Sequence, residues 1–138
     1  MEAPPHLLER EPNTQIALAV GGPLIFGAIA GVLLGVNETA YLVISVIAIF
    51  GGIAAGYEHP DADEGSIRGL CAGLVFGATI LAVSAVSGAE PKADLPDPPA
   101  FLIVVTTILS MIFGAIGGWL RKRHDRRERS ASRDAARA

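Results

Sequence analysis

Charge is confined to a few short segments of this chain, and long apolar blocks separate them. Four blocks contain no Asp, Glu, Lys, Arg or His, namely residues 16–36, 39–57, 69–88 and 100–120. Each is close to the ~20 apolar residues that a helix needs to cross a hydrocarbon core of roughly 30 Å. A helix of a soluble bundle needs a polar face toward water, which none of these blocks provides. The pattern therefore predicts an all-α integral membrane protein with four transmembrane helices.

Short polar segments divide the blocks and suggest their topology. The turn Asn37-Glu38 is brief enough to make the first two helices an antiparallel hairpin. Residues 58–68 link this hairpin to a second one, whose helices are joined by the proline-rich residues 89–99. The predicted divisions are an N-terminal arm (1–15), a four-helix transmembrane domain (16–120) and a basic tail (121–138).

Two short motifs recur at corresponding places in the two hairpins. The sequence LIFGA at 24–28 resembles LVFGA at 74–78, and IFGGI at 49–53 resembles IFGAI at 112–116. Two hairpins inserted in the same orientation would form a parallel internal repeat, related by an axis along the membrane normal. Chance matching within a small apolar alphabet is the alternative, and the sequence leaves both open.

The net charge of −3 hides a strong asymmetry between the ends of the chain. Residues 121–138 contain eight basic and three acidic side chains. The positive-inside rule predicts that this tail is cytoplasmic, and four crossings then place the N-terminus on the same side. We expect Arg121, Lys122 and Arg123, directly after the last block, to contact anionic lipid headgroups. The tail lacks aromatic residues and interleaves acids with bases, so nucleic acid is not an expected partner.

Glycines recur at intervals of four residues in all four blocks. This spacing places them one above another on a helix face. Helices in lipid associate through close backbone contact, which small residues permit. The predicted helix-packing positions are Gly27, Gly31, Gly35, Gly52, Gly56, Gly69, Gly73, Gly77, Gly114 and Gly118. The contacts could lie within one chain or between chains, and the extent of the small-residue surface favours a homo-oligomer or a partner membrane subunit. The alternative is that glycine is simply common in membrane helices.

Hydroxyl side chains are the main polar groups within the blocks. Thr79, Thr106 and Ser110 could line a narrow path for an ion or solute. The alternative, which we favour, is that they donate to carbonyls of their own or a neighbouring helix.

The segment 58–68 is the richest in possible metal ligands. Carboxylate and imidazole groups that could ligate a divalent cation are Glu58, His59, Asp61, Asp63 and Glu64. The complete ligand series of a calcium loop is missing. We therefore favour a solvated acidic turn in which Asp63, Glu64 or Ser66 caps the following helix, with no metal and no cofactor.

The absence of ionisable side chains from the blocks bears on function. Pumps, proton-coupled carriers and intramembrane enzymes use such groups, so no catalytic residue is predicted and an enzyme is disfavoured. The first hypothesis is a non-enzymatic protein that assembles through its glycine faces and forms a passive channel or carrier for an ion or small solute. The second is an accessory or scaffold subunit of a larger membrane complex.

Overall fold

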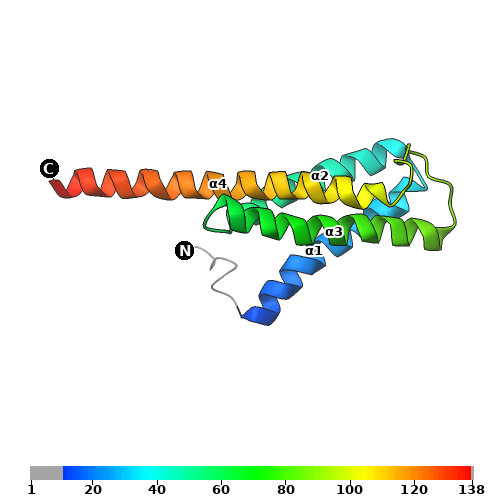
Figure 1. The fold of residues 1–138 in the computed structure, drawn as a ribbon, viewed down its shortest axis with the longest axis horizontal. Helices are drawn as coiled ribbons and strands as arrows, with labels where there is room; N and C mark the ends of the chain where they lie inside the picture. The colour runs from blue at the N-terminus through cyan, green and yellow to red at the C-terminus, as the bar shows by residue number, and fades with distance from the viewer. Residues whose placement is uncertain (1–10, 138) are drawn as a thin grey trace.

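Four long helices account for most of the chain. The computed structural model describes residues 11–137, which contain no strand (Figure 1). The helices are α1 (Pro12–Leu34), α2 (Glu38–Tyr57), α3 (Ala62–Ser87) and α4 (Phe101–Arg137). All four are long and apolar enough to cross a membrane. The predicted all-α fold with four such helices is confirmed.

Local sequence signals set two of the helix ends. The Asn37 side chain accepts a hydrogen bond from the Ala40 amide at 2.9 Å, which caps the first turn of α2. α3 ends at Gly88, whose φ of 64° lies in the left-handed region where a glycine avoids the clash of a Cβ. Asn37 thus begins α2, and Gly88 ends α3, each at a polar segment.

The start of α3 differs from the sequence prediction. Its N-cap is Asp61, whose carboxylate accepts from the amides of Asp63 and Glu64 at 3.1 Å. The prediction that Asp63, Glu64 or Ser66 is the cap was wrong, because the helix begins at Ala62 rather than near the apolar block. Arg68, which we assigned to the connecting loop, consequently lies in the second turn of α3.

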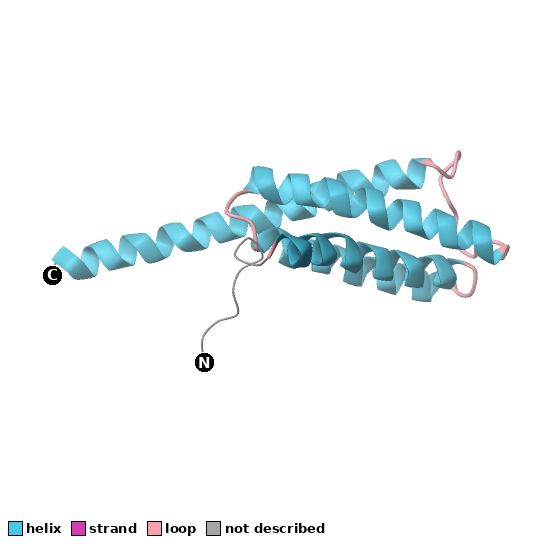
Figure 2. Cartoon of the chain, turned by 90° about the horizontal axis from the view of Figure 1, so that it is seen from below, coloured by secondary structure: helices cyan, strands magenta, loops and turns pink. Residues whose placement is uncertain are grey.

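The helix contacts define how the bundle is ordered. α1 lies beside α3 with the same residue order, since Gly27 faces Phe76 and Gly31 faces Ile80. Figure 2 shows the helices lying side by side, with the connecting segments at the ends of the bundle.

α3 and α4 pair with opposite residue order. Gly65 lies against Gly114, and Gly77 lies against Ile103. The antiparallel hairpin of α1 with α2 and the internal repeat remain predictions.

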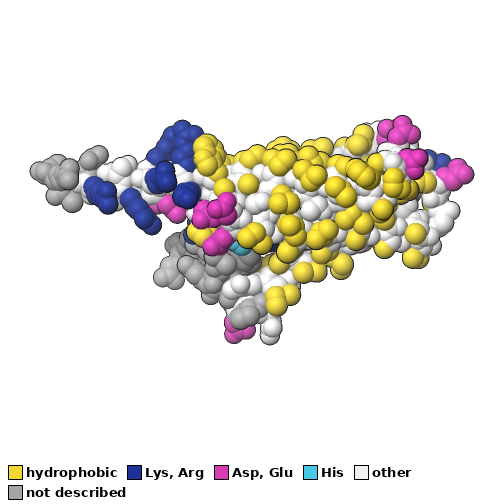
Figure 3. All heavy atoms as spheres, in the orientation of Figure 1, with side chains coloured by type: hydrophobic (Ala, Val, Ile, Leu, Met, Phe, Trp, Pro, Cys, Tyr) yellow, Lys and Arg dark blue, Asp and Glu magenta, His cyan; other side chains and the backbone are white. Residues whose placement is uncertain are grey.

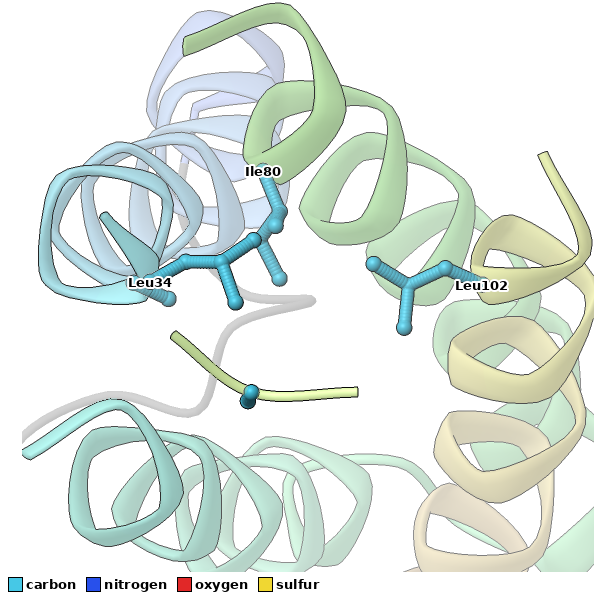
Figure 4. Packing of buried hydrophobic residues seen from close by; sticks show 5 residues of the cluster. Leu34, Ile80 and Leu102 are labelled. Atoms are coloured by element: carbon cyan, nitrogen blue, oxygen red, sulfur yellow. The ribbon is translucent and has the colours of Figure 1, made fainter. Parts of the chain in front are cut away.

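Apolar side chains cover the outside of the bundle and charged ones gather toward its ends (Figure 3). The buried apolar cluster consists of Ala30, Leu34, Ile80, Ala93 and Leu102. In Figure 4, Leu34, Ile80 and Leu102 come from three helices and point toward a common centre. The backbone of residues 89–99 closes this end, where the Lys92 amide donates to the Leu34 carbonyl at 2.7 Å.

Helices α1 and α4 extend into the predicted N-terminal arm and the predicted C-terminal tail. α1 begins at Pro12, so residues 12–15 of the predicted arm are helical, while residues 1–10 lie outside the described part of the chain. α4 runs through the predicted tail as one helix that extends well past the other three (Figure 1).

Candidate functional site

Most of the glycines singled out from the sequence lie where two helices of the same chain meet. Gly73 has no room for a side chain, since a Cβ would lie 2.5 Å from Thr107 Cα and 2.7 Å from the Thr106 carbonyl oxygen. At Gly27, a Cβ would lie 2.8 Å from the Phe76 carbonyl oxygen. Real Cβ atoms essentially never approach so closely. These positions bring backbones together as small residues do in membrane helices.

The other members of the set occupy similar positions, with one exception. Places where an added Cβ would meet another segment of this chain at under 3.0 Å also include Gly31, Gly35, Gly56, Gly69, Gly77, Gly114 and Gly118. Gly52 differs, because nothing lies within 4 Å of its Cβ position. Sequence reasoning did not include Gly65, which meets Gly114, or Gly117, which meets Ile53 and Tyr57.

An apolar hollow of about 200 Å³ lies between the helices. All four helices line it, and their contributions include three aromatic rings, Phe26 on α1, Phe76 on α3 and Phe113 on α4. From Arg68 to Phe76 the lining follows α3 for roughly 12 Å, at 1.5 Å per residue. The hollow and the buried cluster around Leu34 therefore follow one another along the bundle, and Phe76, which lines the hollow, also packs against the cluster.

Gly52 lines this hollow, together with its neighbour Gly51. Neither has an atom within 4 Å of its Cβ position. The absent side chains at these two positions therefore leave space inside the hollow and bring no helices of the described chain together.

Arg68 is the one charged side chain among the residues that line the hollow. Its Nη2 donates to the Leu18 carbonyl oxygen of α1 at 3.2 Å. Its Nε and Nη1 are buried and have no hydrogen-bond partner among the residues that the structure describes. Buried charges in proteins are ordinarily paired, and an ionisable side chain inside a membrane-crossing segment is a functional candidate by default.

The three predicted path-lining hydroxyls are divided between two environments. Thr106 and Ser110 line the hollow, whereas Thr79 does not. The Thr79 hydroxyl donates to the Val75 carbonyl of its own helix at 2.7 Å. That of Thr106 lies 3.1 Å from the Gly73 carbonyl across the helix contact, and 2.9 Å from the Leu102 carbonyl. Internal hydrogen bonding, the alternative weighed from the sequence, describes Thr79 and Thr106.

The acidic segment between α2 and α3 holds no gathered ligand set. Within residues 11–137, no three side chains of His, Cys, Asp or Glu are grouped so as to hold a metal ion. Asp61 acts as the helix cap, and the Glu58 carbonyl accepts from Arg121 of α4. The contact with Arg121 ties the end of α2 to α4.

His59 is the buried member of this segment, with 8% of its surface exposed. Its Nδ1 lies 3.8 Å from the Glu64 carboxylate, and both ring nitrogens lack a hydrogen-bond partner among the described residues. Burial lowers the pKa of His59, and the Arg68 charge lowers it further. Glu64 and Glu58 oppose these effects in part. The ring is therefore neutral at physiological pH.

This lowered pKa predicts acid sensitivity. The unfolded chain, with an ordinary histidine pKa of about 6.5, binds a proton before the folded chain does. The stabilisation from neutral His59 is complete above that pH and is lost as the pH falls through it toward the folded value. We expect the melting temperature in detergent to fall between pH 7.5 and pH 5, and to fall less in His59→Gln. His124→Gln, at an exposed site of α4, is the control and should keep the wild-type profile. Equal acid sensitivity in all three proteins would contradict this role of His59.

The three basic residues predicted to contact lipid headgroups lie in different settings. Arg121 is half-buried and is held by the Glu58 carbonyl and by Asp125, whose carboxylate lies 3.9 Å away. Lys122 and Arg123 are exposed, and the Arg123 guanidinium stacks 5.3 Å from the centre of the Trp119 ring. Their contact with lipid remains a prediction.

Arg68 is the residue that sequence reasoning missed, and two signals could have located it. Asp61, followed by Asp63 and Glu64, is a helix start pattern that puts Arg68 one turn and a half inside α3. The four-residue glycine spacing also extends upstream from Gly69 to Gly65. The charge-free block starting at residue 69 was mistaken for the whole helix.

Comparison with known proteins finds no matching family model, no matching curated protein and no matching solved structure. The hollow and its lining residues are therefore the features of this chain that bear on its function.

Proposed function

We propose that this chain is a small, non-enzymatic, multi-pass membrane protein that carries a small solute through the space between its helices. The observation that supports this is the hollow of about 200 Å³ lined by all four helices, with Arg68 and the hydroxyl residues Thr106 and Ser110 in its wall. Solute sites in helical membrane proteins lie between helices in this way. Most of the predicted packing glycines make contacts within the chain. Gly51 and Gly52 make none within the described residues and line the hollow instead.

A carrier fits the packing better than a permanently open channel. The half of the bundle beyond the hollow is filled by Leu34 and Ile80, both 0% exposed, and by Leu102. A solute could leave in that direction only if these side chains moved apart. Close-packed clusters of this kind switch between discrete arrangements.

The proposal is tested by passive flux in reconstituted vesicles. Vesicles with and without the protein are loaded with a panel of small ions and uncharged solutes, and efflux is followed by light scattering. We expect at least one solute to leave faster when the wild-type protein is present. Gly52→Leu should suppress this efflux by filling the hollow, since position 52 lines it and a Cβ there has no atom within 4 Å. Gly21→Leu, which also enters open space but does not line the hollow, is the matched control. A panel in which no solute leaves faster than from protein-free vesicles would contradict the proposal.

Orientation is part of the proposal. By the positive-inside rule, the basic residues in the C-terminal part of α4 favour a cytoplasmic location for that end, and four crossings would then put the N-terminus on the same side. The hollow would then lie in the cytoplasmic half of the bilayer, and the cluster around Leu34 would close the outer half.

A second candidate is an accessory or scaffold subunit of a larger membrane complex. It is favoured by the basic C-terminal part of α4, residues 121–137, which extends past the bundle (Figure 1). The mass of the particle solubilised from its native membrane separates the candidates. A stoichiometric foreign subunit would support the accessory role, and a particle made of this chain alone would support the carrier.

A further inference from the structure

The lining of the hollow combines one cation with mostly apolar walls, in which Ser45, Thr106 and Ser110 are the hydroxyl residues. Arg68 lies at one end with Leu18 of α1 and Phe113 of α4, while Phe26 and Phe76 lie toward the other end. No Asp or Glu side chain in the described part of the chain lies within 4.0 Å of the Arg68 guanidinium. A ligand that fills the hollow would therefore meet positive charge at one end and hydrocarbon along its length.

The free donors of Arg68 define the head of such a ligand. The Leu18 carbonyl accepts one N–H of Nη2, and the N–H groups of Nε and Nη1 have no partner among the described residues. The second N–H of Nη2, together with that of Nε or of Nη1, forms a planar fork that matches the two oxygens of a carboxylate. Water is a poorer substitute there, because most of the surrounding wall is apolar and Ser45, Thr106 and Ser110 are the only hydroxyl residues that the described part of the chain contributes to it.

We propose that the hollow binds a single-chain amphiphile with a carboxylate head, with the carboxylate against Arg68 and the alkyl chain between the three phenylalanine rings. The open positions Gly51 and Gly52 give the chain its space on the α2 side. This inference rests on the proposed function, since it names the class of solute that the carrier would take.

Photolabelling in lipid nanodiscs tests this binding. The probe is decanoic acid with a diazirine on its alkyl chain, added to the protein in phosphatidylcholine nanodiscs, and the labelled residues are mapped by mass spectrometry. We expect labels on the lining residues of α2 and α4, with unlabelled decanoate competing. Decanol lacks the charge and acetate lacks the chain, so neither should compete at equal concentration.

Two pairs of variants locate the site. Arg68→Gln should lower labelling of the lining at least tenfold, whereas Arg126→Gln, at an exposed arginine of α4, should leave it unchanged. Gly52→Leu should also abolish this labelling, whereas Gly21→Leu should not. Because a Cβ at position 52 has no atom within 4 Å, Gly52→Leu forces no backbone apart at that atom and is informative even if Arg68→Gln fails to fold.

The possible outcomes separate this inference from the carrier proposal. Labels spread evenly over the lipid-facing surface, or unchanged by both Arg68→Gln and Gly52→Leu, would overturn the binding site. Effective competition by acetate or decanol would overturn the amphiphilic carboxylate as its ligand. Specific labelling without any solute flux in vesicles would leave the site standing and refute only the carrier.

Discussion

Replacing Gly73 by alanine is expected to destabilise the bundle by about 1–3 kcal/mol, the usual cost of forcing extra atoms into a packed contact. The new Cβ would lie 2.5 Å from Thr107 Cα, and this neighbour is backbone that cannot rotate away. Alanine favours the helix by up to ~1 kcal/mol over glycine, which is too little to compensate. The shift would be measured as the free energy of unfolding in mixed detergent micelles.

Gly21→Ala is the matched control for this experiment. Gly21 also lies inside a helix, but nothing is within 4 Å of its Cβ position. Only the propensity gain applies there, so Gly21→Ala should be neutral or more stable than wild type. If the two variants changed stability equally, the close contact of α3 with α4 would not be the reason for Gly73.

Leu34→Ala is expected to cost about 2–5 kcal/mol of folding stability, as truncation of a fully buried leucine does. Leu34 has 0% of its surface exposed and packs with Ile80, Ala93 and Leu102. These residues come from α1, α3, α4 and the 89–99 connection, so no single side chain can move to fill the space left. Thermal unfolding in detergent measures the loss.

Leu42→Ala removes the same atoms from an outward position of α2, where the leucine is 51% exposed. Its expected effect is within about 0.5 kcal/mol, as for most surface substitutions. A comparable loss in both variants would show that the cluster around Leu34 is not a distinct core. Under the proposed function, Leu34→Ala should also raise solute leak through the vesicle membrane, since it loosens the closed half.

Local signals made several features of the fold predictable. Long charge-free blocks marked the four helices, because crossing a hydrocarbon layer depends on the composition of about 20 consecutive residues. The Asn37 side chain caps the start of α2, and the left-handed backbone of Gly88 ends α3. The first turns of α3 were not predicted, because Asp61 to Arg68 is polar and resembles a loop when judged by hydropathy alone.

The candidate site was less predictable than the helices. Four-residue spacing aligned the glycines on helix faces, but spacing does not say which face meets another helix and which is left open. Gly52 and Gly56 share one periodicity, yet Gly56 meets the Gly114 backbone and Gly52 meets no atom within 4 Å. Their difference depends on how α2 is placed against α4, which involves residues about sixty positions apart.

By itself, the sequence determined the number and approximate extent of the apolar helices, since those depend on the solvation of contiguous residues. Only the tertiary structure decided that backbones of one chain meet at Gly73 and Gly114, that space remains beside Gly51 and Gly52, and that Arg68 reaches it. The reason is geometric, because the rotation and offset of each helix are set by its neighbours and determine whether a small residue makes a contact or a cavity.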